Sequence, residues 1–390
     1  MKRRAILGLD IIRLFAALLV VLFHFTYRIS LPGSTGYEIS RGLIKFPWAP
    51  GTTSVGRVGV EIFFVISGLV IAYSANGSSP ADFVRSRILR LVPAAWVCAT
   101  ITLSVAWVVR DAPLGHLLVR WLRSLAFEPY GEQIDGSYWT LGVECSFYLA
   151  VFILLFLNKF RWIEGLGHAL ALASTLFWCF VGYRSWSMPA LIGENRTIQL
   201  LLVAHGCEFA LGIFIWLSIT CGITIGRILG LAVSFLGSSI QVLLSSPRHE
   251  DAVVSLVIWV VAVIAIWISI IGNDLAHRYV KGFGPRIIRT LGVTTYPLYL
   301  IHQLVGSALM AVLVRMGVSS LIALAIALVS VLIIAGAVAE VGESIIKKGL
   351  TPLIRRLIEL CTWVSRKDLS CKTLEFRGGG PAPANVGNSA

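Results

Sequence analysis

Ten apolar stretches dominate this sequence, and each is long enough to cross a membrane core of roughly 30 Å as a helix. They cover residues 6–26, 58–75, 93–109, 138–157, 167–182, 198–218, 226–245, 252–272, 290–313 and 318–341. Of the 390 residues, 57% are hydrophobic and only 14% are charged, about half the charged share of a soluble domain. We therefore predict an all-α fold, a polytopic integral membrane bundle of about ten transmembrane helices. The composition excludes a secreted disulfide module, a nucleic-acid-binding domain and a disordered chain.

The basic residues set the predicted orientation, because Lys and Arg collect in cytoplasmic loops. With a cytoplasmic N-terminus, 21 of the 33 Lys and Arg residues lie inside and 11 outside, and Arg13 lies within the first stretch. An even number of spans puts both termini in the cytoplasm of a cell whose inner or plasma membrane holds the chain. We predict a transmembrane domain, 1–349, and a basic, partly disordered tail, 350–390. Two mixed segments, 114–128 and 276–289, are predicted to lie in the membrane interface.

The first stretch contains three ionisable residues, Asp10, Arg13 and His24, and such groups are costly inside a membrane. Arg13 and His24 are eleven residues apart, so in a helix they share a face and lie about 16 Å apart along the axis. Arg13 is then predicted in the inner part of the membrane and His24 near the outer part. The structural alternative is that Asp10 pairs with Arg13 across one turn and His24 caps an interfacial end.

Two more ionisable residues are predicted at the level of His24. Glu144 lies about 10 Å inside a stretch that enters from the outside, and His302 lies past the midpoint of one that enters from the inside. Pro297, in the same stretch as His302, frees a backbone carbonyl and is expected to kink the helix. Three ionisable groups from three spans at one depth indicate a site in the outer half of the membrane.

The remaining intramembrane acids have two interpretations each. Glu61 is either a site residue or an interfacial acid that snorkels to the surface. Glu208 either joins the site or makes a single helix–helix hydrogen bond. Near the middle of the same stretch as Glu61, Ser67 and Gly68 are small enough to predict close helix contact.

Three arginines precede the third stretch, at Arg85, Arg87 and Arg90. In a helix Arg87 and Arg90 share a face, and the planar guanidinium suits phosphate binding. From charge alone, the favoured alternative is that the three arginines only set the topology of the chain.

The motifs that carry a family resemblance are Arg13-x10-His24, GVEIFFVISG at 59–68, Arg87-Ile-Leu-Arg90, WTLGVECSFYL at 139–149 and YPLYLIH at 296–302. Together, and in this order over about residues 7–340, they resemble the membrane-bound acyltransferase 3 family, which O-acylates sugars and other hydroxyl compounds. Each motif is weak alone, and their order makes the resemblance specific. Glu61 stands where many members of that family have Asp.

The resemblance implies transfer of an acyl group, usually acetyl, from cytoplasmic acyl-CoA to a hydroxyl of a surface or exported carbohydrate. Acyl-CoA is then a donor substrate, and no permanently bound cofactor is expected. In this scheme Arg87 and Arg90, with Arg85 beside them, hold the nucleotide phosphates. Arg13 lines the path of the pantetheine arm.

The resemblance also implies the catalytic roles. His24 is the general base for the acceptor hydroxyl, or is itself acylated and relays the group. Glu144 orients His24 or stabilises its imidazolium. The expected site-lining residues are Asp10, Glu61, Ser67, Trp139, Tyr296, His302 and Glu208. No metal is expected, since the cysteines and histidines form no ligand cluster.

Two rival functions are considered. A proton-coupled transporter or exporter would use the intramembrane Arg, His and Glu groups as a relay, and a scaffold of a polysaccharide export complex would need none of them. The acceptor site is expected in the outer loops 29–57 and 110–137. There Trp48, Trp121 and Tyr130 are either sugar-stacking residues or members of the aromatic belt.

Overall fold

The protein is described by a computed structural model that covers residues 6–110, 112–184 and 195–356. Chain contacts divide it into two compact units, Met1–Ser344 and Ile345–Ala390. Within the described residues the first unit is a bundle of helices and contains no strand. Most of the predicted tail, residues 357–390, lies outside the described residues, and the predicted boundary after residue 349 stays a prediction.

The longer helices of the described chain are α1 (Leu7–Leu22), α3 (Gly59–Ala75), α4 (Pro80–Val109), α5 (Leu114–Leu125), α6 (Trp139–Phe156), α7 (Ile163–Arg184), α10 (Gly206–Cys221), α11 (Ile225–Leu244), α12 (Ala252–Ile271), α14 (Gly284–Ile301), α15 (Ser307–Arg315) and α16 (Ser320–Ala337). Short α-helices are α2 (Thr35–Ser40), α9 (Arg196–Leu200) and α13 (Asn273–Tyr279). Three π-helical segments are η1 (Phe23–Tyr27), η7 (His302–Gly306) and η8 (Val338–Gly342). Short 3₁₀ turns include η2 (Arg28–Ser30), η3 (Ser54–Val58) and η4 (Gly136–Tyr138).

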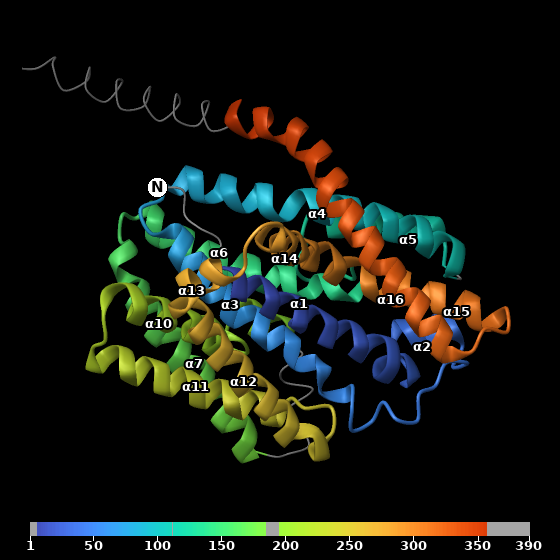
Figure 1. The fold of residues 1–390 in the computed structure, drawn as a ribbon, viewed down its shortest axis with the longest axis horizontal. Coiled ribbons are helices and arrows are strands. Elements are labelled where there is room, and N and C mark those ends of the chain that lie inside the picture. Colours follow the sequence, from blue (N-terminus) through green and yellow to red (C-terminus); the bar gives the residue numbers. More distant parts are fainter. Residues whose placement is uncertain (1–5, 111, 185–194, 357–390) are drawn as a thin grey trace, which may run out of the picture. The chain divides into compact units, whose positions relative to one another are not determined.

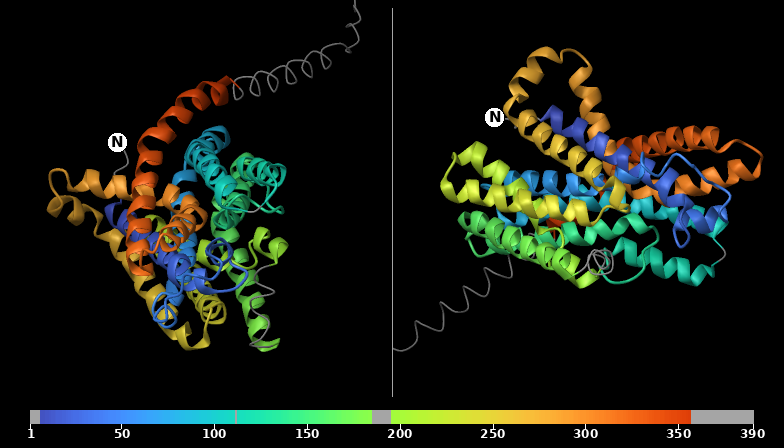
Figure 2. Two further views of the ribbon diagram at one scale, coloured as in Figure 1. Left: turned by 90° about the vertical axis from the view of Figure 1, so that its right-hand side faces the viewer. Right: turned by 90° about the horizontal axis from the view of Figure 1, so that it is seen from below.

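The number and character of the helices confirm the predicted membrane bundle. In the described part of the chain, nine helical segments are long and apolar enough to cross a membrane, and α10 is a shorter apolar helix. Counting α10 as a span gives the predicted ten. The predicted interfacial segment 114–128 forms α5, which packs on α4, and Figure 2 shows α13 and the turn into α14 projecting away from their neighbours.

Three predicted spans differ from the observed helices. The third begins at Pro80 rather than at residue 93, because Ser79 caps the helix by accepting from the Asp82 N–H and α4 then continues through Pro93. The sixth is divided into α9 and α10 by a turn with Leu202 at positive φ. The ninth is interrupted by η7, which separates α14 from α15.

Helix α1 is central to the first unit, where it contacts α3, α12 and α14 (Figure 1). Helix α10 packs against α3, α7 and α11. The α3–α10 crossing is very close: a Cβ atom at Gly68 would lie 2.2 Å from the Phe209 carbonyl oxygen, and one at Gly212 would lie 2.2 Å from that of Val65. This confirms the close helix contact predicted at Gly68.

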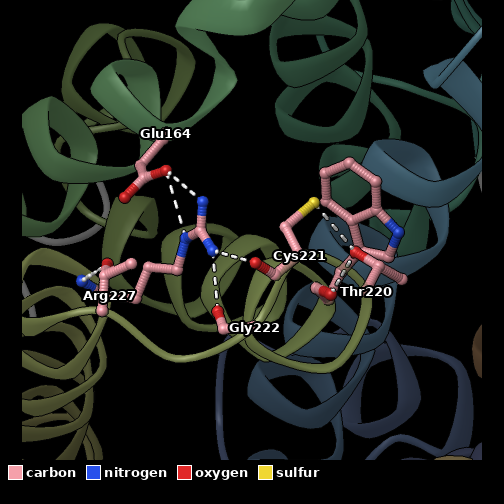
Figure 3. Close-up of polar contacts among 7 residues, drawn as sticks. Glu164, Thr220, Cys221, Gly222 and Arg227 are labelled. Atoms are coloured by element: carbon pink, nitrogen blue, oxygen red, sulfur yellow. Dashed lines mark hydrogen bonds and ion pairs between the residues drawn. The ribbon is translucent and has the colours of Figure 1, made fainter.

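Arg227 of α11 links this helix to α7 and to the end of α10 (Figure 3). Arg227 donates from Nε and Nη2 to Glu164 Oε2, at 3.2 and 2.9 Å, so the pair links α11 to α7. Its Nη1 donates to the carbonyls of Cys221 and Gly222, where α10 ends. Arg227 thus satisfies backbone acceptors that the end of α10 leaves open.

Candidate active site

A cavity with a volume of about 120 Å³ lies between α1, α3, α4, α6 and α14. We call it the Arg pocket, because Arg13, Arg87 and Arg90 line it together. Its polar and aromatic wall also contains Ser67, Thr140, Glu144, Tyr148, Tyr296 and Tyr299. Four predicted site residues from four helices besides α4 therefore converge with the predicted arginine pair: Arg13 of α1, Ser67 of α3, Glu144 of α6 and Tyr296 of α14.

The two α4 arginines lie against aromatic rings. The Arg87 guanidinium carbon is 5.6 Å from the centre of the Tyr148 ring, and that of Arg90 is 5.5 Å from the centre of the Tyr296 ring. Such contacts hold a guanidinium in place while leaving its N–H groups available to a ligand. The Arg pocket is therefore suited to an anion, and phosphate is the anion that arginine forks bind most readily.

Arg85 does not join this cluster, which corrects its predicted place beside the nucleotide phosphates. It is absent from the residues lining the Arg pocket. Two residues along a helix rotate a side chain by about 200°, so Arg85 lies on the face of α4 opposite to Arg87.

Glu144 lies in the Arg pocket and does not contact His24, which corrects its predicted role as the group that orients His24. Its Oε1 accepts from Ser67 Oγ at 3.2 Å and from the Tyr148 hydroxyl. The reason is the position of Glu144 along α6. Because α6 begins only after the buried turn η4, Glu144 lies beside the arginines of the Arg pocket and not beside His24.

A second cavity, with a volume of about 590 Å³, contains His24 in its wall. We call it the His pocket. Residues of η1, η2, η3, η4 and α9 line it, together with the turn that follows α11. Val60 and Tyr299 line both pockets, so these two side chains form the wall between them. Arg13 and His24 lie on either side of that wall, about 16 Å apart along one helix.

His24 and His302 form a pair at the edge of the His pocket. His302 Nε2 lies 3.2 Å from His24 Nδ1, and the two rings meet edge to face with centres 4.8 Å apart. Both histidines belong to π-helical segments, η1 and η7, which contact each other. Such segments are rare and are frequent at functional sites.

The hydrogen bonds assign the protons of the pair. His302 Nδ1 is 2.7 Å from the Tyr299 carbonyl oxygen and must donate to it, so the Nε2 of a neutral His302 is an acceptor. His24 Nδ1 then faces two acceptors, this Nε2 and the Val20 carbonyl oxygen at 2.9 Å. It therefore carries the proton. The lone pair of a neutral His24 is left on Nε2, and His24 lines the pocket.

Asp135 is a buried acid near this pair that the sequence reasoning missed. Its Oδ1 accepts from the Ser137 N–H and hydroxyl at 2.8 and 2.7 Å, and its Oδ2 accepts from the Leu304 N–H at 2.9 Å, inside η7. Burial raises the pKa of Asp135 above its usual value, and these hydrogen bonds oppose the shift. The acid joins the turn before α6 to the π-helix that holds His302. Its position in the segment Asp135-Gly-Ser, just before a predicted span, was the available signal.

Three other predicted site residues, Asp10, Glu61 and Glu208, line neither the Arg pocket nor the His pocket. Asp10 accepts from Arg13 Nη1 at 3.2 Å, so the pairing considered as the structural alternative is present. Glu61 is 3% exposed, which excludes snorkelling, and it lines a small cavity that shares Arg57 with the His pocket. Glu208 is fully buried and lines neither pocket.

The aromatic residues of the His pocket are not those expected from the loops. Trp48, Trp121 and Tyr130 are absent from its described wall, and Trp121 instead donates to Thr100 Oγ1 on α4 at 3.3 Å. Trp139, predicted as site-lining, is in the wall together with Trp178.

Comparison with known proteins gives one family and several relatives. The model of the acyltransferase 3 family, described as an acyltransferase domain, matches residues 6–340. Exopolysaccharide production protein ExoZ of Rhizobium meliloti (strain 1021) is 30% identical over 133 residues, 31% of this chain and 42% of the relative. The O-acetyl transferase of Shigella phage Sf6 is 30% identical over 156 residues, 36% of this chain and 43% of the relative.

The alignments with these two relatives thus span less than half of their lengths. No solved structure is significantly similar to the chain. The family model covers nearly the whole helical bundle, including both pockets and every motif that suggested the resemblance. The chain therefore belongs to the acyltransferase 3 family.

Proposed function

We propose that this protein is a membrane O-acyltransferase that moves an acetyl or short acyl group from cytoplasmic acyl-CoA to a hydroxyl of a surface or exported carbohydrate. The observation that carries the proposal is the placement of His24, which lines the His pocket, on the same helical span as Arg13 of the Arg pocket. The relatives' names, an O-acetyl transferase and an exopolysaccharide production protein, favour acetyl and a carbohydrate.

The Arg pocket is the proposed donor site. Arg87 and Arg90 bind the phosphates of the nucleotide, and Arg13 lies further along the path of the pantetheine arm. The span of about 16 Å from Arg13 to His24 suits an extended arm that ends in a thioester. The acyl group then passes the wall formed by Val60 and Tyr299 to reach His24.

The proposed chemical step takes place at His24. Its Nε2 accepts the proton of the acceptor hydroxyl while the oxygen attacks the thioester carbonyl carbon. The carbon–sulfur bond breaks, the CoA sulfur leaves, and the imidazolium of His24 returns the proton to that sulfur. His302 accepts from Nδ1 of His24 throughout and holds the ring in the orientation that the step requires.

The test uses membranes that contain equal amounts of wild type, His24→Ala or His168→Ala, incubated with radiolabelled acetyl-CoA and a glycan mixture. His168 is a matched control, since it lies within α7 and lines neither pocket. We expect label in the glycan fraction with wild type and His168→Ala, and a loss of at least about 100-fold with His24→Ala. Transfer by His24→Ala at the wild-type rate would show that His24 is not the base.

A further inference from the structure

The His pocket carries an unusual excess of positive charge. Arg28, Arg57 and Arg196 line it from three separate elements, η2, η3 and α9, and no Asp or Glu is among its described lining residues. In the described part of the chain, none of the three arginines forms an ion pair with a carboxylate. Cations gathered in a partly buried cavity repel one another and lose hydration. The arrangement therefore favours a ligand with negative charge.

The three guanidinium groups differ in what they offer. Arg196 is held by hydrogen bonds to the carbonyls of Pro129 and Trp139 and to Gln199 Oε1, so it supplies a fixed charge. Arg57 donates to the Ser245 carbonyl and keeps further N–H groups available. Arg28 follows the π-helix of His24 directly in sequence. An anion bound at Arg28 would therefore lie close to the proposed base.

The rest of the wall fits a sugar better than a bare anion. The partly exposed Trp139 and the side chain of Gln303 line the cavity, so its wall includes an aromatic ring and an amide group. The cavity volume of about 590 Å³ lies within the roughly 300–1,000 Å³ range of pockets that hold drug-sized ligands. An oligosaccharide with stacked rings and hydrogen-bonded hydroxyls makes use of all three features.

We infer that the acceptor bound in the His pocket is an acidic carbohydrate, in which a carboxylate or phosphate on one sugar is bound by Arg28 and Arg57 while a neighbouring hydroxyl reaches His24. This inference rests on the proposed function, because the bound carbohydrate is an acceptor only if the protein transfers an acyl group. The binding preference itself is a property of the cavity and holds without any acyl donor.

The test measures equilibrium binding to the detergent-solubilised full chain in the absence of acyl-CoA. The probes are trigalacturonate, its carboxyl-reduced neutral form, and a galactose phosphate that separates phosphate from carboxylate as the preferred anion. We expect at least one acidic probe to bind ten or more times more tightly than the neutral one, with the preference shrinking at high salt. Arg28→Gln and Arg57→Gln should each reduce the preference severalfold, Arg28→Lys should retain most of it, and the exposed Arg41→Gln should leave it unchanged.

Equal binding of acidic and neutral probes, or binding of none of them, would overturn the inference. Because the assay contains no donor, its result is independent of acyl transfer. A protein that prefers the acidic probe but transfers nothing from acetyl-CoA would overturn the proposed function alone. A protein that acylates neutral and acidic glycans equally would overturn only the acidic acceptor.

Discussion

At the scale of single residues, the proposed chemistry depends on which nitrogen of His24 carries the proton. His302 Nε2 accepts from His24 Nδ1 at 3.2 Å, and His302 is itself fixed by donating to the Tyr299 carbonyl. We expect His302→Phe to lower kcat about tenfold, the equivalent of one lost hydrogen bond, with an unchanged KM for acetyl-CoA. His302→Gln retains an acceptor and should recover part of the rate. Steady-state kinetics would decide, and full activity in His302→Phe would show that His302 does not position His24.

The arginines of α4 provide an internal comparison for the donor site. Arg87 and Arg90 line the Arg pocket, whereas Arg85 lies on the same helix and does not. We expect Arg87→Ala and Arg90→Ala each to raise the KM for acetyl-CoA about tenfold or more, since each removes charged hydrogen bonds to phosphate. Arg85→Ala should change it little. Equal effects at all three positions would mean that the arginines act through topology or general charge rather than as ligands.

Sequence reasoning predicted six of the residues that line the Arg pocket, but only His24 and Trp139 of those that line the His pocket, and it did not predict how they are grouped. The eleven-residue spacing predicted one helix face for Arg13 and His24, which line different pockets, and the Arg87–Arg90 spacing predicted a shared face for two residues that line the same pocket. The predicted depth of Glu144 was wrong. That depth was counted from an assumed membrane surface, whereas α6 begins only after a buried turn. The contact of His24 with His302 joins positions 278 residues apart. It depends on two π-helical segments that no periodicity in the sequence signals.

At the scale of helices, the bundle depends on the close α3–α10 crossing. A Cβ atom at Gly68 would meet the backbone of Phe209 at 2.2 Å, so the helices must separate to accept it. We expect Gly68→Ala to cost about 1–3 kcal/mol, seen as a lower Tm in detergent. Gly336→Ala is the control, because its Cβ would meet nothing within 4 Å in the interior of α16, and it should be neutral or slightly stabilising. A similar Tm for both variants would show that the crossing tolerates separation.

Hydropathy predicted the presence of these helices well, but it predicted their first and last residues poorly. The run of α4 from Pro80 was missed because its first turns carry arginines that a membrane scan rejects, yet Ser79 and Pro80 are a strong start signal for a helix. The division of 198–218 into α9 and α10 was missed because the turn between them is itself apolar. The backbone polar groups of such a turn can be satisfied where the turn is buried in a bundle, and a hydropathy scan does not detect the turn.

At the scale of the whole molecule, the proposed function requires a defined orientation, because the proposed donor, acyl-CoA, is made in the cytoplasm and the proposed acceptor is exported. The family membership and the apolar helices establish a multi-pass membrane protein. The orientation itself rests on the excess of basic residues in one set of connections. In that orientation the connection between α3 and α4, which leads into Arg87 and Arg90, lies in the cytoplasm, and η1 with His24 lies toward the exterior.

This orientation predicts opposite labelling of two exposed lysines, Lys45 before α3 and Lys159 between α6 and α7. The seven native cysteines are first replaced, and each lysine is then changed to Cys. We expect a membrane-impermeant maleimide to label Lys45→Cys in intact cells and Lys159→Cys only after the membrane is permeabilised. The reverse pattern would place the Arg pocket toward the exterior, away from cytoplasmic acyl-CoA, and would contradict the proposed donor. Labelling of both in intact cells would mean that an even number of spans separates the two lysines, so that the three helices between them, α3, α4 and α6, do not all cross the membrane as predicted.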